Sequence, residues 1–158
     1  PEHLTEARVW LSELVVRVAC ERADEADFAA LQANVEATMR ADAAGDFDER
    51  QRLNREFHLI LARATRNPII AITMEAVMEV LGHFIMQIGP SANPFTLPSR
   101  ERFLRHLRAR DADAAAGEMS QFLKEMPDAD PAPWNARGPA EGAAGPPARG
   151  GPPPRSWR

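Results

Sequence analysis

Hydrophobic residues recur every three or four positions along residues 1–126, which is the spacing of one face of an α-helix. The clearest stripe lies in residues 47–66, where apolar side chains fall on one side of the predicted helix: Leu53, Phe57, Ile60, Leu61 and Ala64. Asn67 and Pro68 then end the segment, because the residue before a proline disfavours the α conformation. No segment alternates between apolar and polar residues as a strand would. The pattern therefore predicts an all-α protein.

Five further segments show the same spacing, and turn signals separate them. We expect these helices at residues 4–23, 25–43 and 69–88, from Ser99 to about residue 110, and from Asp111 or Asp113 onward. Asp24 with Asp27 three residues later is typical of a helix start, and Gly45 is typical of a helix end. Short connections between such helices favour antiparallel neighbours. The expected fold is an antiparallel bundle of about six helices.

The stripes also predict which parts of the helices are buried. Residues 25–43 carry a narrow apolar stripe that ends at Met39, whereas residues 69–88 carry apolar side chains on more than one face. A helix that is apolar on several sides is usually buried on several sides. We therefore expect residues 69–88 to lie at the centre of the bundle.

The composition changes after Met126. Residues 127–158 hold nine of the fourteen prolines and five of the nine glycines. Such a segment buries too little apolar surface to offset the entropy lost on ordering. We expect a helical ligand-binding domain at residues 1–126 and a disordered Pro/Gly/Ala-rich tail at residues 127–158. The proline-rich end is either a linker or a polyproline ligand.

Charge and composition narrow the function classes. The net charge is −4 and basic residues do not cluster, so we do not expect this chain itself to bind nucleic acid. No apolar run reaches the roughly 18 residues of a membrane span, and no signal peptide opens the chain, so we expect a cytoplasmic protein without a membrane partner. The chain begins at Pro1, and we interpret it as a piece of a longer protein.

Motifs of the common enzyme classes are missing, including the phosphate loop, GxSxG, CxxC and HExxH. A nucleophilic enzyme needs a base beside Ser or Cys, and Cys20 has no histidine near it in the sequence. We therefore do not expect an enzyme. Of the four histidines, His3 and His106 fit exposed positions, whereas His58 and His83 lie among apolar residues.

His58 and Asn54 lie four residues apart, which places them on the same side of their helix beside Phe57. Two interpretations remain open. Either His58 and His83 are core histidines bonded to a backbone carbonyl or water, or they belong to a ligand or metal site inside the bundle. Neutral imidazole binds Zn²⁺ and Ni²⁺ well, so the second interpretation is chemically sound.

The run LNREFHLILARATRNPII resembles the D-x-x-F-H…A-x-x-N-P signature of the FCD domain. That domain is the helical effector-binding half of FadR-type regulators in the GntR family. EARVWLSELVVRVACERA is similar to its opening, and RFLRHLRARDADAAAGEMSQFL to its closing helix pair. The resemblance covers residues 4–126. It implies a homodimeric transcription regulator that contacts DNA through an N-terminal winged-helix domain absent from this chain.

In most of that family an Asp and three His hold a divalent metal. The resemblance places Asn54 at the Asp position and His58 at the first His, while Arg100 and Phe122 fall at the two later ones. An amide and one imidazole are a weak donor set for Zn²⁺ or Ni²⁺, and a cationic side chain would repel the metal. Of these four positions, at most His58 and Asn54 would bind a metal. His83, which lies outside them, is a further candidate ligand.

The substitutions suggest a different anchor for the effector. Either Arg100 holds a carboxylate by paired hydrogen bonds, as the metal does in the relatives, or it points to solvent. We expect Asn54, His58, His83, Arg100 and Phe122 to bind a small carboxylate that shifts the geometry of the dimer. The alternative is a degenerate bundle that has lost its effector and serves as a dimerisation or scaffold module.

Overall fold

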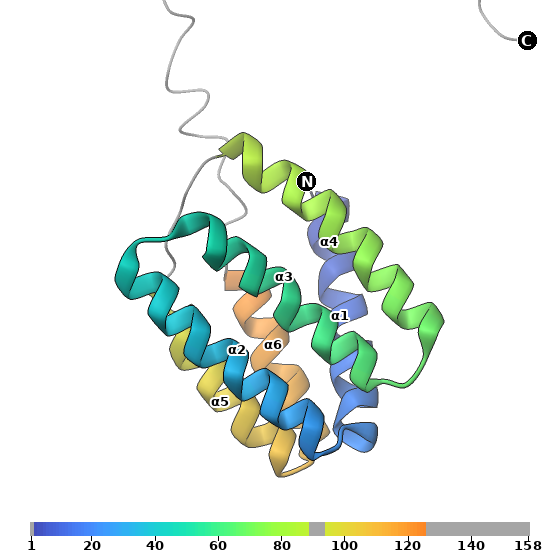
Figure 1. Cartoon of the computed structure of the whole chain (residues 1–158). Helices are drawn as coiled ribbons and strands as arrows, with labels where there is room; N and C mark the ends of the chain where they lie inside the picture. Colours follow the sequence, from blue (N-terminus) through green and yellow to red (C-terminus); the bar gives the residue numbers. More distant parts are fainter. Residues whose placement is uncertain (1, 89–93, 126–158) are drawn as a thin grey trace, which may run out of the picture.

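The computed structural model describes residues 2–88 and 94–125, and these residues form six helices. In chain order the helices are α1 (Glu2–Arg22), α2 (Glu25–Ala44), α3 (Phe47–Ala64), α4 (Pro68–Ile88), α5 (Thr96–Arg108) and α6 (Ala112–Glu125). They lie side by side in one bundle (Figure 1). The prediction of an all-α bundle is confirmed. The predicted tail at residues 127–158 lies outside the described residues.

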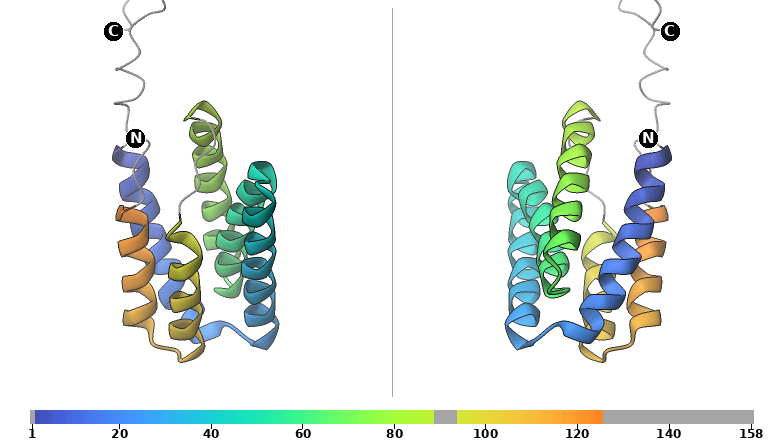
Figure 2. Two further views of the ribbon diagram at one scale, coloured as in Figure 1. Left: turned by 90° about the vertical axis from the view of Figure 1, so that its left-hand side faces the viewer. Right: turned by 90° about the vertical axis from the view of Figure 1, so that its right-hand side faces the viewer.

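The helices pair in an order that differs from their order in the chain. Helix α1 packs against α6 and α3, α2 packs against α3 and α5, and α5 packs against α6. In the side views of Figure 2, α1 and α6 lie on one side of the molecule and α2 lies on the other. Helix α3 contacts α1, α2 and α4, so its inner face looks into the middle of the bundle.

The core forms where the apolar stripes of the helices meet. Phe57 of α3 and Phe103 of α5 are almost fully buried, and their rings meet edge to face with centroids 5.9 Å apart. Further large apolar side chains that are fully buried come from α1 to α5, among them Leu31, Leu61, Met74, Leu107, Val15, Val16 and Val35. The apolar stripe predicted for α3 is therefore confirmed at its main positions.

The predicted start and end of α2 are also confirmed. The backbone N–H of Asp27 donates to Asp24 Oδ1, and the backbone N–H of Asp24 donates to Asp27 Oδ2, both at 3.0 Å. This reciprocal pair satisfies two of the N–H groups that a helix start leaves open. Gly45 has φ +65°, the left-handed conformation that glycine adopts at a helix end without steric cost.

The prediction that residues 69–88 lie at the centre is wrong. Among the described residues, α4 contacts only α3 and α1, and Figure 1 shows it at one side of the bundle. Met74 and Met78 are buried, but Ile69 is 70% exposed and Ile72 is 61% exposed. Helix α4 is apolar on two faces and only one of them meets the core. Met39, at the end of the stripe of α2, is likewise 48% exposed.

The predicted start of the fifth helix is also wrong. Helix α5 begins at Thr96, so Ser99 lies inside it and is buried, and its hydroxyl donates to Glu118 of α6 at 2.8 Å. Pro98 does not prevent the earlier start, because the first turn of a helix has no intrahelical acceptor for its N–H groups.

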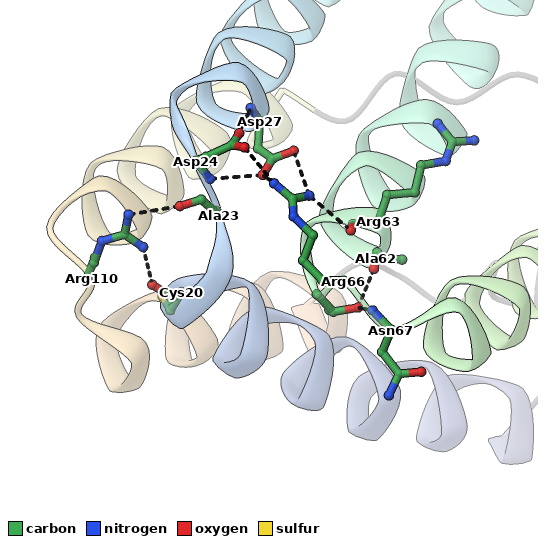
Figure 3. A network of polar contacts seen from close by, with 10 residues as sticks. Cys20, Ala23, Asp24, Asp27, Ala62, Arg63, Arg66, Asn67 and Arg110 are labelled. Atoms are coloured by element: carbon green, nitrogen blue, oxygen red, sulfur yellow. Dashed lines mark hydrogen bonds and ion pairs between the residues drawn. The ribbon is translucent and has the colours of Figure 1, made fainter.

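Hydrogen bonds from two arginines link the segments that connect consecutive helices at one end of the bundle (Figure 3). Arg66 follows α3 with φ 57°, and its Nη2 donates to carboxylate oxygens of Asp24 and Asp27, both at 2.8 Å. Arg110 follows α5 with φ 55°, and its guanidinium donates to two backbone carbonyls at the end of α1, at 2.8 and 2.9 Å. These contacts join the α1–α2, α3–α4 and α5–α6 connections.

Candidate functional site

Arg100 lies in the second turn of α5 and is only 5% exposed, so it does not point to solvent. Its Nη2 donates to Asn54 Oδ1 of α3 at 2.6 Å. Its Cζ lies 4.3 Å from the centroid of the Phe57 ring, which is a cation–π contact. Helix α3 therefore holds both one amino group and one face of the guanidinium, and the orientation of Arg100 is fixed.

The second amino group of Arg100 has no such contact. Nη1 is buried and has no hydrogen-bond acceptor within residues 2–88 and 94–125. Burial and the positive charges of Arg50 and Arg8 lower the pKa of Arg100 to about 10, so the side chain stays charged at neutral pH. A buried donor without an acceptor costs about 1–3 kcal/mol, and more when it is charged. Such a group is expected to meet water, an ion or a ligand.

His58 lies one turn after Asn54 on α3 and is 4% exposed. Its ring meets that of Phe57 at 89°, with centroids 5.8 Å apart. Burial and the positive charges of Arg8 and Arg100 hold the pKa of His58 well below 6.5. The imidazole is therefore neutral at pH 7 and carries one hydrogen-bond donor and one acceptor. This position suits both interpretations from the sequence, a core histidine and a ligand-binding one.

Two further buried arginines act on the site through their charges, and the sequence interpretation missed them. Arg8 of α1 is 8% exposed and Arg50 of α3 is 9% exposed. Arg50 Nε forms an ion pair with Asp42 Oδ1 at 2.9 Å. The sequence does carry a signal for Arg50, because it lies four residues before Asn54 and so on the same side of α3.

The structure brings together three of the five predicted site residues: Asn54, His58 and Arg100. His83 lies on the exposed side of α4, so its side chain does not enter the bundle from there. Phe122 lies on α6, where it is half-buried and packs against the hydrophobic core. The candidate site is therefore built from α1, α3 and α5.

The residues of this site do not fit a divalent metal. Within the part of the chain that the structure describes, no three His, Cys, Asp or Glu side chains gather as a metal site would require. The amide oxygen of Asn54 already accepts a hydrogen bond from Arg100. The buried charges of Arg8 and Arg100 would repel Zn²⁺ or Ni²⁺ at His58. The same charges would attract an anion.

Fold and site together define a class of protein: a helical bundle with a buried cationic site inside it. The family model of the FCD domain matches residues 3–125. The chain belongs to the FCD domain family, and the resemblance drawn from the sequence is confirmed. Within the described ranges no helix is both long enough and apolar enough to span a membrane.

Solved structures of GntR-family regulators show the same fold. E. coli McbR/YncC matches with a TM-score of 0.70 and 22% identity, covering 78% of this chain and 63% of that one. Streptococcus agalactiae GntR matches with a TM-score of 0.66 and 20% identity, covering 77% of this chain and 55% of that one. This chain thus spans less than two thirds of either relative. The comparison with curated proteins finds no match.

Proposed function

We propose that this FCD domain is the effector-sensing part of a GntR-type transcription regulator, and that it binds a small organic acid without a metal. The domain is not an enzyme in this proposal. Asn54, His58 and Arg100 form the binding site, and Arg100 supplies the positive charge that a metal provides in most of the family. DNA binding belongs to a winged-helix domain of the full-length regulator.

One observation carries the proposal: Arg100 keeps a charged, buried amino group that has no acceptor among the described residues, while Asn54 and Phe57 hold the rest of its guanidinium. A carboxylate oxygen is the natural acceptor for such a group, because charge-assisted hydrogen bonds are stronger than neutral ones. The neutral imidazole of His58 adds a second polar contact at the same site. Since the Arg100 side chain is already oriented, binding of the acid does not have to order it, and this part of the entropy cost of binding is avoided.

The position of the site suggests how binding would be transmitted. Arg100 comes from α5, Asn54 and His58 come from α3, and the charge of Arg8 reaches both helices from α1. An acid bound between these helices would favour the packing that fits it best. An effector that prefers one arrangement by about 1–3 kcal/mol is enough for a useful switch.

A homodimer is the second part of the proposal. Large apolar side chains are exposed on α1 and α4, which pack against each other: Trp10 (65%), Leu14 (49%), Ile69 (70%) and Ile72 (61%). Exposed apolar patches often mark association surfaces. Sedimentation equilibrium of the chain and of an Ile69→Glu, Ile72→Glu variant tests this part. A monomeric wild-type chain would contradict it.

The alternative function is a dimerisation or scaffold module that has lost its effector. Its support is that only His58 occupies a metal-ligand position of the family with a metal-binding side chain. The same exposed apolar side chains on α1 and α4 would serve such a module. The two functions differ in one respect, because only the sensing domain responds to a small acid.

Thermal denaturation in EDTA separates these functions. We expect carboxylic acids such as butyrate and succinate to raise the Tm of the chain, and Arg100→Gln to abolish the increase. Arg105→Gln is the matched control, because Arg105 lies on the same helix and is exposed. A Tm that rises with Ni²⁺ or Zn²⁺ in the absence of EDTA, but does not rise with acids in its presence, would contradict metal-free sensing. A Tm that responds to neither would favour the scaffold module.

A further inference from the structure

Three arginines on three stretches of the chain are buried around one site. Arg8 lies on α1, Arg50 lies early on α3 and Arg100 lies on α5, and each is less than one tenth exposed. Lysine and arginine are seldom buried to this extent in a protein interior. The presence of three such side chains suggests a function beyond holding the bundle together.

The charges of these arginines act on one another. Arg50 and Arg8 both lower the pKa of Arg100, and Arg8 and Arg100 both lower the pKa of His58. The arginines are therefore close enough to repel one another through the interior, where charges are weakly screened. Asp42 lies against Arg50, with Asp42 Oδ1 2.9 Å from Arg50 Nε. A ligand that brings more than one negative charge would relieve more of this repulsion than a ligand that brings one.

The geometry of Arg100 limits what a single carboxylate can do. Nη2 is bonded to Asn54, so Nη1 is the amino group that remains for a ligand. A carboxylate that accepts from Nη1 is held by Arg100 at one point. A second anionic group on the same ligand would therefore be held by other side chains.

A polar group on α1 supports this extension of the site. Ser12 is 2% exposed, and its hydroxyl has no hydrogen-bond partner among the residues that the structure describes. Ser12 lies one helical turn after Arg8, so the two side chains share a face of α1. A buried hydroxyl without a partner is a second sign, independent of Arg100, that a polar ligand reaches α1.

We infer that the site takes a ligand with two separate anionic groups, one bonded to Arg100 Nη1 and the other held by Arg8 and Arg50. A short dicarboxylate has this chemistry. The inference rests on the proposed function, because it extends the same site from α3 and α5 to α1. It assigns a binding role to Arg8 and Arg50, and a role as hydrogen-bond donor to Ser12 on the same face of α1 as Arg8.

Isothermal titration of the whole chain with butyrate and with succinate tests the inference. The two acids share a four-carbon skeleton and differ in the second carboxylate. Both titrations are made in EDTA at pH 7.5 and at one ionic strength, since salt weakens charge interactions. We expect succinate to bind at least about tenfold more tightly than butyrate, because a second charge-assisted hydrogen bond supplies that difference. Inorganic phosphate, a dianion with both charges on one group, should bind more weakly than succinate.

Substitutions assign the difference to particular arginines. Arg8→Gln should weaken succinate about tenfold and leave butyrate within about threefold of the wild type, because it removes only the second anchor. Arg50→Gln should act in the same direction, and it carries the test if Arg8→Gln does not fold. Arg100→Gln should weaken both acids, and the exposed control Arg105→Gln should weaken neither.

The outcomes separate this inference from the proposed function. Equal affinities for butyrate and succinate, or an unchanged preference in both Arg8→Gln and Arg50→Gln, would overturn the two-anion site and leave acid sensing intact. Tighter binding of phosphate than of succinate would also overturn it. If neither acid binds the wild type, or if Arg100→Gln has no effect, the proposed function itself fails.

Discussion

Arginines at one end of this bundle and in its interior are in opposite situations. At the end that holds the turns, Arg66 donates to two carboxylates, and the hydrogen bond and charge of Asp27 help to raise its pKa. In the interior, Arg100 has one acceptor within residues 2–88 and 94–125, the amide of Asn54, and burial with two like charges lowers its pKa to about 10. The donor groups of Arg66 thus meet carboxylate acceptors, whereas Arg100 Nη1 meets no acceptor among the described residues.

This difference separates a structural arginine from a binding one. The guanidinium groups of Arg66 and Arg110 meet acceptors supplied by the helix start of α2 and by the end of α1. Arg100 is equally well oriented, yet one of its amino groups is buried without an acceptor in the part of the chain that the structure describes. A charge that is held rigidly and left partly unpaired lowers the stability of the free protein. It is suited to a ligand that completes the pairing.

The largest effect is expected at the turns. Arg110→Met removes two hydrogen bonds from a charged group to backbone carbonyls of α1, at 2.8 and 2.9 Å. We expect a loss of about 2 kcal/mol in the free energy of unfolding, since such bonds are worth more than neutral ones but partial exposure weakens them. Urea denaturation measures the loss. An Arg110→Met chain as stable as the wild type would show that the turn arginine is not structural.

A pH effect of intermediate size is expected from His58. Its folded pKa lies well below 6.5, so between that pKa and 6.5 the unfolded chain binds more protons than the folded one. The stability that His58 contributes is present above pH 6.5 and is lost as the pH falls below it. The slope approaches about 1.4 kcal/mol per pH unit. Urea denaturation between pH 7.5 and 5 measures it, and His58→Gln should flatten the profile.

The smallest and most telling effect is expected at Arg100. Arg100→Met replaces a buried, partly unpaired charge by an apolar side chain of similar length. Replacing buried charges by apolar groups is often neutral or stabilising, so we expect a change within about 1 kcal/mol or a gain. Acid binding should be lost in the same variant. A large loss of stability at Arg100→Met, matching that at Arg110→Met, would remove the distinction between the interior arginine and the arginines of the connections.

The sequence predicted the helices well because their signals are local. The stripe around Phe57, the reciprocal pair of Asp24 and Asp27, and the left-handed Gly45 each depend on residues within a few positions of one another. The start of α5 was missed because Ser99 looks like a helix cap, whereas it bonds Glu118 on another helix. The preference of serine for a helix start is outweighed here by a contact between two helices, which the sequence alone does not reveal.

The packing of the helices against one another was less predictable from the sequence than the helices themselves. The apolar residues of α4 indicated burial, but periodicity does not say which neighbours cover a face, and Ile69 and Ile72 are exposed. Asn54, His58 and Arg100 could be placed together through the family resemblance. Arg8 and Arg50 could not, because arginine is usually a surface residue and its burial depends on packing between helices.

A crystal structure of the chain grown with malonate or succinate, in EDTA, tests the central claim most directly. The account predicts a carboxylate oxygen about 2.7–2.9 Å from Arg100 Nη1, the usual length of a charge-assisted hydrogen bond. It also predicts the second carboxylate on the side of Arg8 and Arg50. A structure in which Arg100 Nη1 bonds only water at saturating acid would contradict metal-free sensing. So would a structure, grown without EDTA, in which a metal ion bound by His58 carries the acid.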